Sequence, residues 1–244
     1  MRRTFYITGT SRGIGLALAN ELLEDSNNYV LGISRNNVIS HERYQHVQLD
    51  LTDLDSVEKF RFTNPEDQSE IYLVNNAGLL GDIQYFGKRK SHDIRNTLLV
   101  NFVSPAMLSN TFIQQFGDVK TTKVILNISS GASKNAIDGW VTYCSSKAGI
   151  EMMSKTIDVE QKQSDPSKKT KILSVAPGII ETAMQEQIRM SDEEDFSRVT
   201  EFIQLKNNGL LDTPESVAKK LRYILLNAQQ YNNVDLDIRN LSFQ

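Results

Sequence analysis

Residues 123–155 read KVILNISSGASKNAIDGWVTYCSSKAGIEMMSK, and this stretch determines the interpretation of the rest of the chain. Its first part, 123–128, is apolar and rich in β-branched residues, which predicts a buried strand. In its last part Tyr143, Lys147 and Glu151 recur at intervals of four residues. Side chains at this spacing share one face of a helix, so we expect a strand, a polar turn and a helix in succession.

A tyrosine and a lysine one helical turn apart form a candidate acid–base pair. The ammonium of Lys147 can stabilise the phenolate of Tyr143 and so lower the pKa of a phenol that ordinarily titrates near pH 10. Such a phenol can donate a proton to a carbonyl oxygen that is being reduced. A lone Tyr-x-x-x-Lys is more often a solvated helix surface. Here Ser130 also lies thirteen residues upstream, at the end of the predicted strand.

The N-terminus carries a glycine-rich turn. A short apolar strand is predicted at 4–8, and GTSRGIG follows at 9–15 before a segment with helical spacing. Strand, glycine turn and helix together can bind a pyrophosphate, because the glycines allow close backbone approach and the helix N-terminus supplies free N–H groups. Glycines also occur at such turns for packing, but the downstream Ser/Tyr/Lys set favours the binding role.

Two arginines indicate which dinucleotide is bound. A second strand, predicted at 29–34, ends at Arg35, and no acidic residue occurs between Asp25 and Glu42. NAD sites place an acidic residue here to bind the ribose hydroxyl, whereas an arginine suits the 2′-phosphate of NADP. Arg12, within the glycine turn, could bind the same phosphate. We therefore expect NADP(H), although either arginine alone could simply be solvated.

Strands and helices alternate along the whole chain. This order predicts an α/β protein with a single-domain Rossmann fold over 1–244: a doubly wound, mostly seven-stranded parallel sheet with helices on both faces. In such sheets ligands bind at the carboxyl ends of the strands. Six residues with binding chemistry follow predicted strands directly: Gly9, Arg35, Asp50, Asn76, Ser130 and Pro177. A loosely patterned acidic segment, 184–210, is expected to form a lid over the substrate.

Composition excludes several classes of protein. A net charge of −3 argues against nucleic acid and anionic membranes as partners. No apolar run reaches transmembrane length, and no signal peptide is evident. The only cysteine, Cys144, cannot form an internal disulfide, which fits a cytoplasmic protein. The three histidines lack metal-ligand spacing, so no metal site is expected.

Taken together, these motifs resemble the short-chain dehydrogenase/reductase family in its compact form. The set comprises TGTSRGIG at 8–15, NNAG at 75–78, Asn101, Ser130, YCSSK at 143–147 and PG at 177–178. The resemblance covers nearly the whole chain. Within the family, SSGAS at 129–133 and PGIIETAMQ at 177–185 resemble the sepiapterin reductase/benzil reductase branch.

The resemblance implies a role for each site residue. Tyr143 would be the general acid, and Lys147 would lower its pKa and hold the nicotinamide ribose. Ser130 would bind the substrate oxygen, and Asn101 would support a water-linked proton relay to Lys147. The expected cofactor-binding residues are Gly9, Ser11, Arg12, Gly13, Ile14, Gly15, Arg35, Asp50, Leu51, Asn76, Ala77, Gly78, Tyr143, Lys147, Pro177, Gly178, Ile180, Thr182 and Met184. Ser130, Trp140, Tyr143 and Met184 are expected to contact substrate, although Trp140 could equally be plain core.

The branch implies an NADPH-dependent carbonyl reductase acting on one carbonyl of a vicinal diketone or on the side-chain ketone of a pterin. Vertebrate-type sepiapterin reductases hold the pterin with an acidic residue near the C-terminus, for which Asp212, Asp235 and Asp237 are the candidates here. Other members of the family reduce different substrates as alcohol dehydrogenases or 3-oxoacyl reductases. A redox-sensing regulator that binds NADP(H) without turnover is a further alternative. By family resemblance we also expect a homodimer or homotetramer.

Overall fold

Parallel strands form the centre of the protein. The computed structural model describes residues 2–65 and 69–243, and within these residues seven strands form one sheet in the order β3-β2-β1-β4-β5-β6-β7. All six neighbouring pairs are parallel. The strands are β1 (Arg3–Thr8), β2 (Asn28–Ser34), β3 (Tyr44–Gln48), β4 (Glu70–Asn75), β5 (Lys123–Ile128), β6 (Thr170–Ala176) and β7 (Asp235–Asp237). This confirms the predicted doubly wound sheet.

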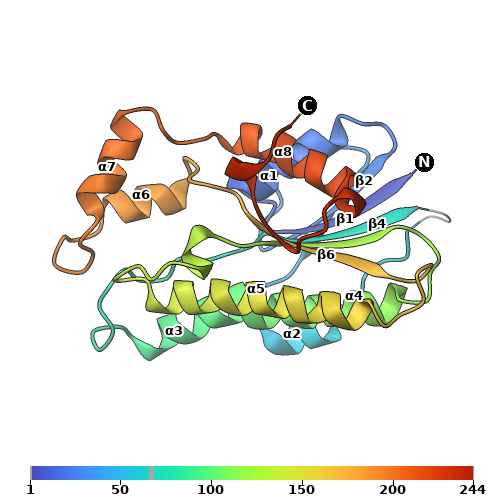
Figure 1. Ribbon diagram of the computed structural model, residues 1–244, viewed down its shortest axis with the longest axis horizontal. Helices are drawn as coiled ribbons and strands as arrows, with labels where there is room; N and C mark the ends of the chain where they lie inside the picture. Colours follow the sequence, from blue (N-terminus) through green and yellow to red (C-terminus); the bar gives the residue numbers. More distant parts are fainter. Residues whose placement is uncertain (1, 66–68, 244) are drawn as a thin grey trace.

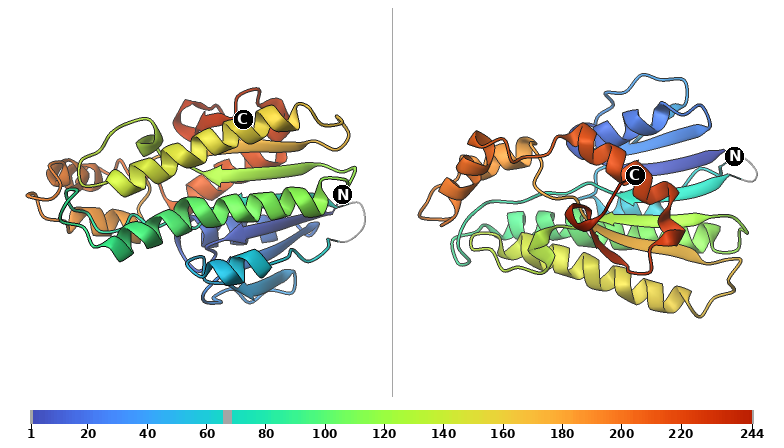
Figure 2. Two further views of the ribbon diagram at one scale, coloured as in Figure 1. Left: turned by 90° about the horizontal axis from the view of Figure 1, so that it is seen from below. Right: turned by 45° about the horizontal axis from the view of Figure 1, so that its top comes forward.

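Helices cover both faces of the sheet (Figure 1 and Figure 2). On one face α1 (Gly13–Leu23) packs against α8 (Pro214–Leu226), and their leucines form a core with β1, β4 and β5. The other face is covered by α2 (Leu54–Lys59), α4 (Ser104–Phe116) and α5 (Val141–Gln161). Because both faces are covered, the central strands read as continuous apolar runs rather than alternating ones.

One long helical segment beside the sheet is interrupted. It consists of α3 (Ser91–Leu98), a π-helical turn at Leu99–Val103, and α4. Asn101 lies in the π-helical turn, where its side chain bonds to the backbone of Leu79 at 2.7 Å in both directions. Single π-helical turns are frequent at functional sites, and this one lies beside the loop that follows β4.

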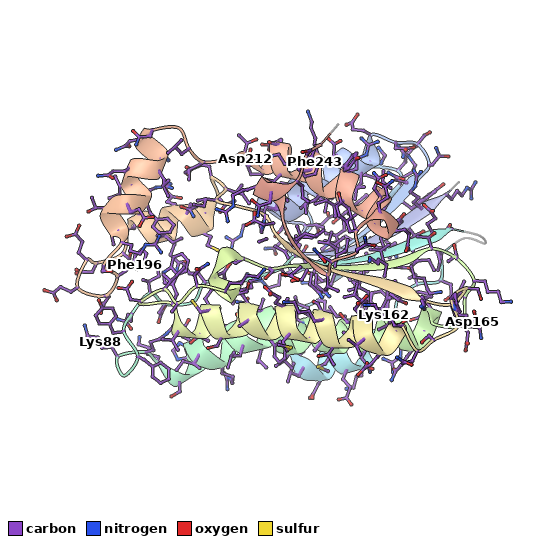
Figure 3. All side chains as sticks on the ribbon, in the orientation of Figure 1. Lys88, Lys162, Asp165, Phe196, Asp212 and Phe243 are labelled. Atoms are coloured by element: carbon purple, nitrogen blue, oxygen red, sulfur yellow. The ribbon has the colours of Figure 1, made fainter. Side chains whose placement is uncertain are left out.

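The segment predicted as a lid contains two short helices, α6 (Ala183–Arg189) and α7 (Val199–Asn207). They project from one end of the sheet, near the label of Phe196 in Figure 3. Lys162 and Asp165, also labelled there, follow the C-terminal end of α5 on the opposite side of the molecule. A third apolar cluster joins this segment to the start of α5 through Trp140, Phe196 and Phe202. No helix among the described residues is long and apolar enough to cross a membrane.

Candidate active site

A cavity of about 950 Å³ opens at the carboxyl ends of the strands, where the strand order reverses between β1 and β4. Ligands bind at this point of doubly wound sheets. Nearly every site residue predicted from the sequence lines it: Gly9, Ser11, Arg12, Gly13, Ile14, Arg35, Asp50, Leu51, Asn76, Ala77, Gly78, Ser130, Trp140, Tyr143, Lys147, Pro177, Gly178, Ile180, Thr182 and Met184. The structure thus brings together residues from the whole length of the chain.

Gly15 and Asn101 lie outside the cavity lining. A Cβ atom at Gly15 would stand 2.3 Å from the carbonyl oxygen of Gly9, so this glycine lets α1 pack directly against the turn. Asn101 is only 1% exposed. Its side-chain amide exchanges two hydrogen bonds with the backbone of Leu79 and donates a third to the Ser146 hydroxyl at 3.1 Å. Asn101 therefore joins the loop after β4 to the helix that carries Tyr143.

Ser130 lies where β5 leads into a 3-10 turn at Gly131–Ser133. Its hydroxyl caps this turn by accepting a hydrogen bond from the Ala132 N–H at 3.2 Å. The same hydroxyl is hydrogen-bonded to Tyr143, and this bond partly offsets the burial that raises the pKa of Tyr143. Ser129 also lines the cavity, but its hydroxyl is buried without a partner among the described residues. The contact with Tyr143 distinguishes Ser130 from its neighbour.

Tyr143 and Lys147 are both buried, and burial dominates their titration. Desolvation raises the pKa of Tyr143 to about 12, against the smaller effect of the Ser130 hydrogen bond, and lowers the pKa of Lys147 to about 8. The Lys147 ammonium lies 5.7 Å from the centroid of the Tyr143 ring and donates to the carbonyl of Ile128 at 2.7 Å. Burial is the largest influence on both groups, and it disfavours the phenolate of Tyr143 and the ammonium of Lys147.

The opposite end of the cavity fits a dinucleotide phosphate. Gly9 has φ +76°, and a Cβ there would stand 3.0 Å from the Cα of Ala77, so only glycine allows this close turn. Within residues 2–65 and 69–243, no side chain caps the N-terminus of α1, which leaves its N–H groups for an anion. Arg12 and Arg35 line the cavity with exposed side chains, and neither has a carboxylate partner within the described residues. These residues can hold the phosphates of a dinucleotide cofactor.

The end of the cavity beside Tyr143 is aromatic. Trp140 lines the cavity, with its ring perpendicular to Tyr143 at 5.8 Å and stacked on Phe196 at 5.4 Å. Phe202, on α7, lies 5.7 Å from Trp140 and also lines the cavity. Trp140 thus belongs both to a core cluster and to the cavity wall, which combines the two alternatives that the sequence left open.

The three C-terminal carboxylates considered for pterin binding point to other partners. Asp212 pairs with Lys220 at 2.5 Å, and Asp237 pairs with Arg239 at 2.6 Å. Asp235 pairs with Lys134 at 2.6 Å. All three aspartates are among the described residues, and none lines the cavity that contains Tyr143.

Comparison with known proteins agrees with this geometry. The family model for short chain dehydrogenases matches residues 3–193. The chain belongs to the short-chain dehydrogenase family. It is therefore an oxidoreductase that binds a nicotinamide cofactor and acts on a small molecule.

Among the relatives of this short-chain dehydrogenase are reductases of both predicted kinds. It is 36% identical to the benzil reductase of Bacillus cereus, over 91% of this chain and 94% of the relative. It is 29% identical to the sepiapterin reductase of Bos taurus, over 71% and 63%. A solved short-chain dehydrogenase/reductase from Saccharomyces cerevisiae superposes with a TM-score of 0.85 at 24% identity, over 98% and 96%. The predicted sepiapterin/benzil reductase branch is confirmed.

Some residues of this dehydrogenase's cavity could not be found from the family motifs. Phe202, Ile188 and Arg198 line the cavity from the two short helices and the segment between them. This segment carries no motif, and only its loose helical pattern indicated that it folds over the site.

Proposed function

We propose that this short-chain dehydrogenase is an NADPH-dependent carbonyl reductase that reduces one carbonyl of a vicinal diketone. The observation that carries the proposal is a single cavity with three parts. Arg12 and Arg35 lie at one end, Ser130 hydrogen-bonds to Tyr143 in the middle, and the aromatic residues Trp140 and Phe202 lie at the other end.

The chain's residues have distinct tasks in this reaction. When bound, NADPH supplies a hydride to the carbonyl carbon. Tyr143 stays protonated at neutral pH, since its pKa is about 12, and its Oη donates a proton to the oxygen on which negative charge develops. The Ser130 hydroxyl stabilises the same oxygen. Lys147, held by the Ile128 carbonyl, keeps a positive charge beside Tyr143 while its ammonium is protonated.

The diketone is favoured over a pterin as substrate. The relatives of higher identity are benzil reductases, at 36% and 34%. An aromatic wall suits the flat aryl groups of such a diketone. In addition, none of the C-terminal carboxylates expected to anchor a pterin lines the cavity.

The proposal is tested by NADPH consumption with benzil, sepiapterin and acetophenone, with NADH run in parallel. We expect turnover of benzil with NADPH well above NADH, and weaker turnover of acetophenone. Tight NADPH binding without turnover of any of these three compounds would instead support the alternative, a redox-sensing regulator that binds NADP(H) without turnover.

We further propose a homodimer or homotetramer in a reducing, cytoplasmic compartment. On α5 the apolar side chains of Met152 and Val159 are 64% and 60% exposed, and they share one helix face that a partner copy could cover. The free thiol of Cys144 fits a reducing compartment. Mass measurement in solution tests the oligomer, since a monomer at micromolar concentration would contradict it.

A further inference from the structure

Helix α5 carries a third ionisable residue below Tyr143 and Lys147. Glu151 follows Lys147 by one helical turn, on the same face, and is only 8% exposed. Carboxylates are rarely buried unless they are paired. The proposed mechanism gives this one no task, so its contacts need an explanation.

Glu151 contacts the turn that carries Ser130. The Ser133 hydroxyl donates to Glu151 Oε2 at 2.6 Å and also lies 2.8 Å from the backbone oxygen of Ser130. The Ser133 N–H donates to that same Ser130 oxygen at 3.0 Å. The side-chain hydroxyl of Ser130 accepts a hydrogen bond from the Ala132 N–H and is hydrogen-bonded to Tyr143. Ser133 therefore fixes the backbone of Ser130, and Glu151 fixes Ser133.

Glu151 is held as a carboxylate by neighbouring cations. Burial alone would raise its pKa, but hydrogen bonds from Lys155 and Ser133 and the charges of Lys134 and Lys155 outweigh burial and lower the pKa. Lys155 Nζ lies 2.7 Å from Glu151 Oε1, and Lys134 Nζ lies 3.8 Å from it. An ionised carboxylate is a stronger and more directional acceptor for the Ser133 hydroxyl than a neutral acid.

The two lysines extend the network to the edge of the sheet. Lys134 and Lys155 approach Asp235 on β7 at 2.6 and 3.6 Å. Lys134 directly follows the 3-10 turn, so the turn is bound both to α5 and to β7. A simple i,i+4 pair between Glu151 and Lys155 would require none of these contacts with the turn.

We propose that Glu151 is a positioning residue for catalysis, which acts through Ser133 to hold Ser130 at the distance and angle that its hydroxyl needs for Tyr143 and the substrate oxygen. This inference rests on the proposed carbonyl reductase, because it assigns Ser130 a task in the transition state. Displacing a reacting group by about 1 Å can cost on the order of 10²-fold in rate. Loosening a support should cost less, about 10-fold.

The test compares steady-state benzil reduction in Ser133→Ala, Glu151→Gln and the double variant. Glu151→Gln keeps the size of the side chain but has one carbonyl oxygen for two donors. We expect kcat to fall about 10-fold in each single variant, while KM for benzil and Kd for NADPH stay within about 2-fold of wild type. The double variant should be no slower than the slower single variant, since both remove the same support. Ser133→Thr, which keeps the hydroxyl, should restore kcat.

Glu160→Gln is the matched control, an exposed glutamate on the same helix, and should turn over like wild type. Two further results separate this inference from the proposed function. Absence of benzil turnover in the wild-type enzyme would overturn the proposed function, whereas wild-type turnover in Ser130→Ala would overturn only the task of Ser130 and the inference that depends on it. Lost turnover in Ser130→Ala with wild-type kcat in Ser133→Ala and Glu151→Gln would overturn the inference alone. Additive losses in the double variant, or equal losses in kcat and in NADPH binding, would also overturn it.

Discussion

Lys147 donates a 2.7 Å hydrogen bond to the carbonyl oxygen of Ile128, the last residue of β5. This bond joins the helix that carries Tyr143 to the strand that leads into Ser130. The two residues that contact the reacting oxygen in the proposed mechanism therefore sit on elements connected through one buried ammonium.

The titration of this ammonium predicts a pH dependence. Burial lowers the pKa of Lys147 to about 8, so its positive charge is present below that pH and is lost above it. We expect kcat/KM for benzil reduction to be constant below about pH 7 and to fall above about pH 8, approaching tenfold per unit, because this parameter reports groups of the free enzyme. Lys162→Ala, which removes an exposed lysine just beyond α5, should leave the profile unchanged. Constant kcat/KM up to pH 10 would contradict the role of Lys147.

The cofactor preference should depend on two arginines. Arg12→Ala and Arg35→Ala each remove a charged hydrogen bond to the 2′-phosphate, typically about 1.5–3 kcal/mol, so we expect Kd for NADPH to rise at least about 10-fold. NADH lacks this phosphate, and its Kd should not change. Calorimetric titration measures both, with Arg95→Ala as an exposed control away from the cavity. Equal weakening of NADPH and NADH would show that the arginines do not bind this phosphate.

Packing at Gly15 predicts a loss of stability. Gly15→Ala places a methyl group against the Gly9 carbonyl, and overpacking of this kind costs about 1–3 kcal/mol. The free energy of unfolding, from urea denaturation, should fall by that amount. Gly131→Ala is the control, since a Cβ there meets nothing within 4 Å. If Gly15→Ala were as stable as Gly131→Ala, the close contact between α1 and the glycine turn would be refuted.

The aromatic wall predicts substrate selection. Phe202→Leu keeps an apolar side chain but removes a ring beside Trp140, and such aromatic contacts contribute about 1 kcal/mol. We expect the ratio of kcat/KM for benzil to that for butane-2,3-dione to fall about 5-fold. Ile203→Ala, on the exposed side of the same helix, should leave the ratio unchanged. An unchanged ratio in Phe202→Leu would remove Phe202 from the substrate site.

The elements around the sheet could be predicted because their signals are local. Apolar runs predicted the strands at 4–8, 29–34 and 123–128, and periodic spacing predicted the face of α5 that carries Tyr143, Lys147 and Glu151. The π-helical turn at Asn101 could not be predicted, since it depends on a long-range bond between Asn101 and Leu79. Local rules describe hydrogen bonds within a helix, not those that interrupt it.

The sequence predicted which residues line the cavity better than it predicted the pKa values of those residues. Gly9, Asn76 and Ser130 lie in one cavity because the carboxyl ends of parallel strands meet at the same edge of the sheet. The pKa values of Tyr143 and Lys147 depend instead on how deeply both are buried, which spacing along a helix cannot reveal. Phe202 was predicted only as part of the segment expected to cover the substrate, because its contact with Trp140 depends on how the segment around α7 folds back.

The central claim is that Tyr143 donates the proton in NADPH-dependent carbonyl reduction, and Tyr143→Phe tests it most directly. This variant keeps the ring that packs against Trp140 and loses only the hydroxyl. NADPH consumption with benzil should fall at least about 10²-fold, as is typical when a general acid is lost, while Kd for NADPH stays at the wild-type value. Near-wild-type turnover in Tyr143→Phe would contradict the account.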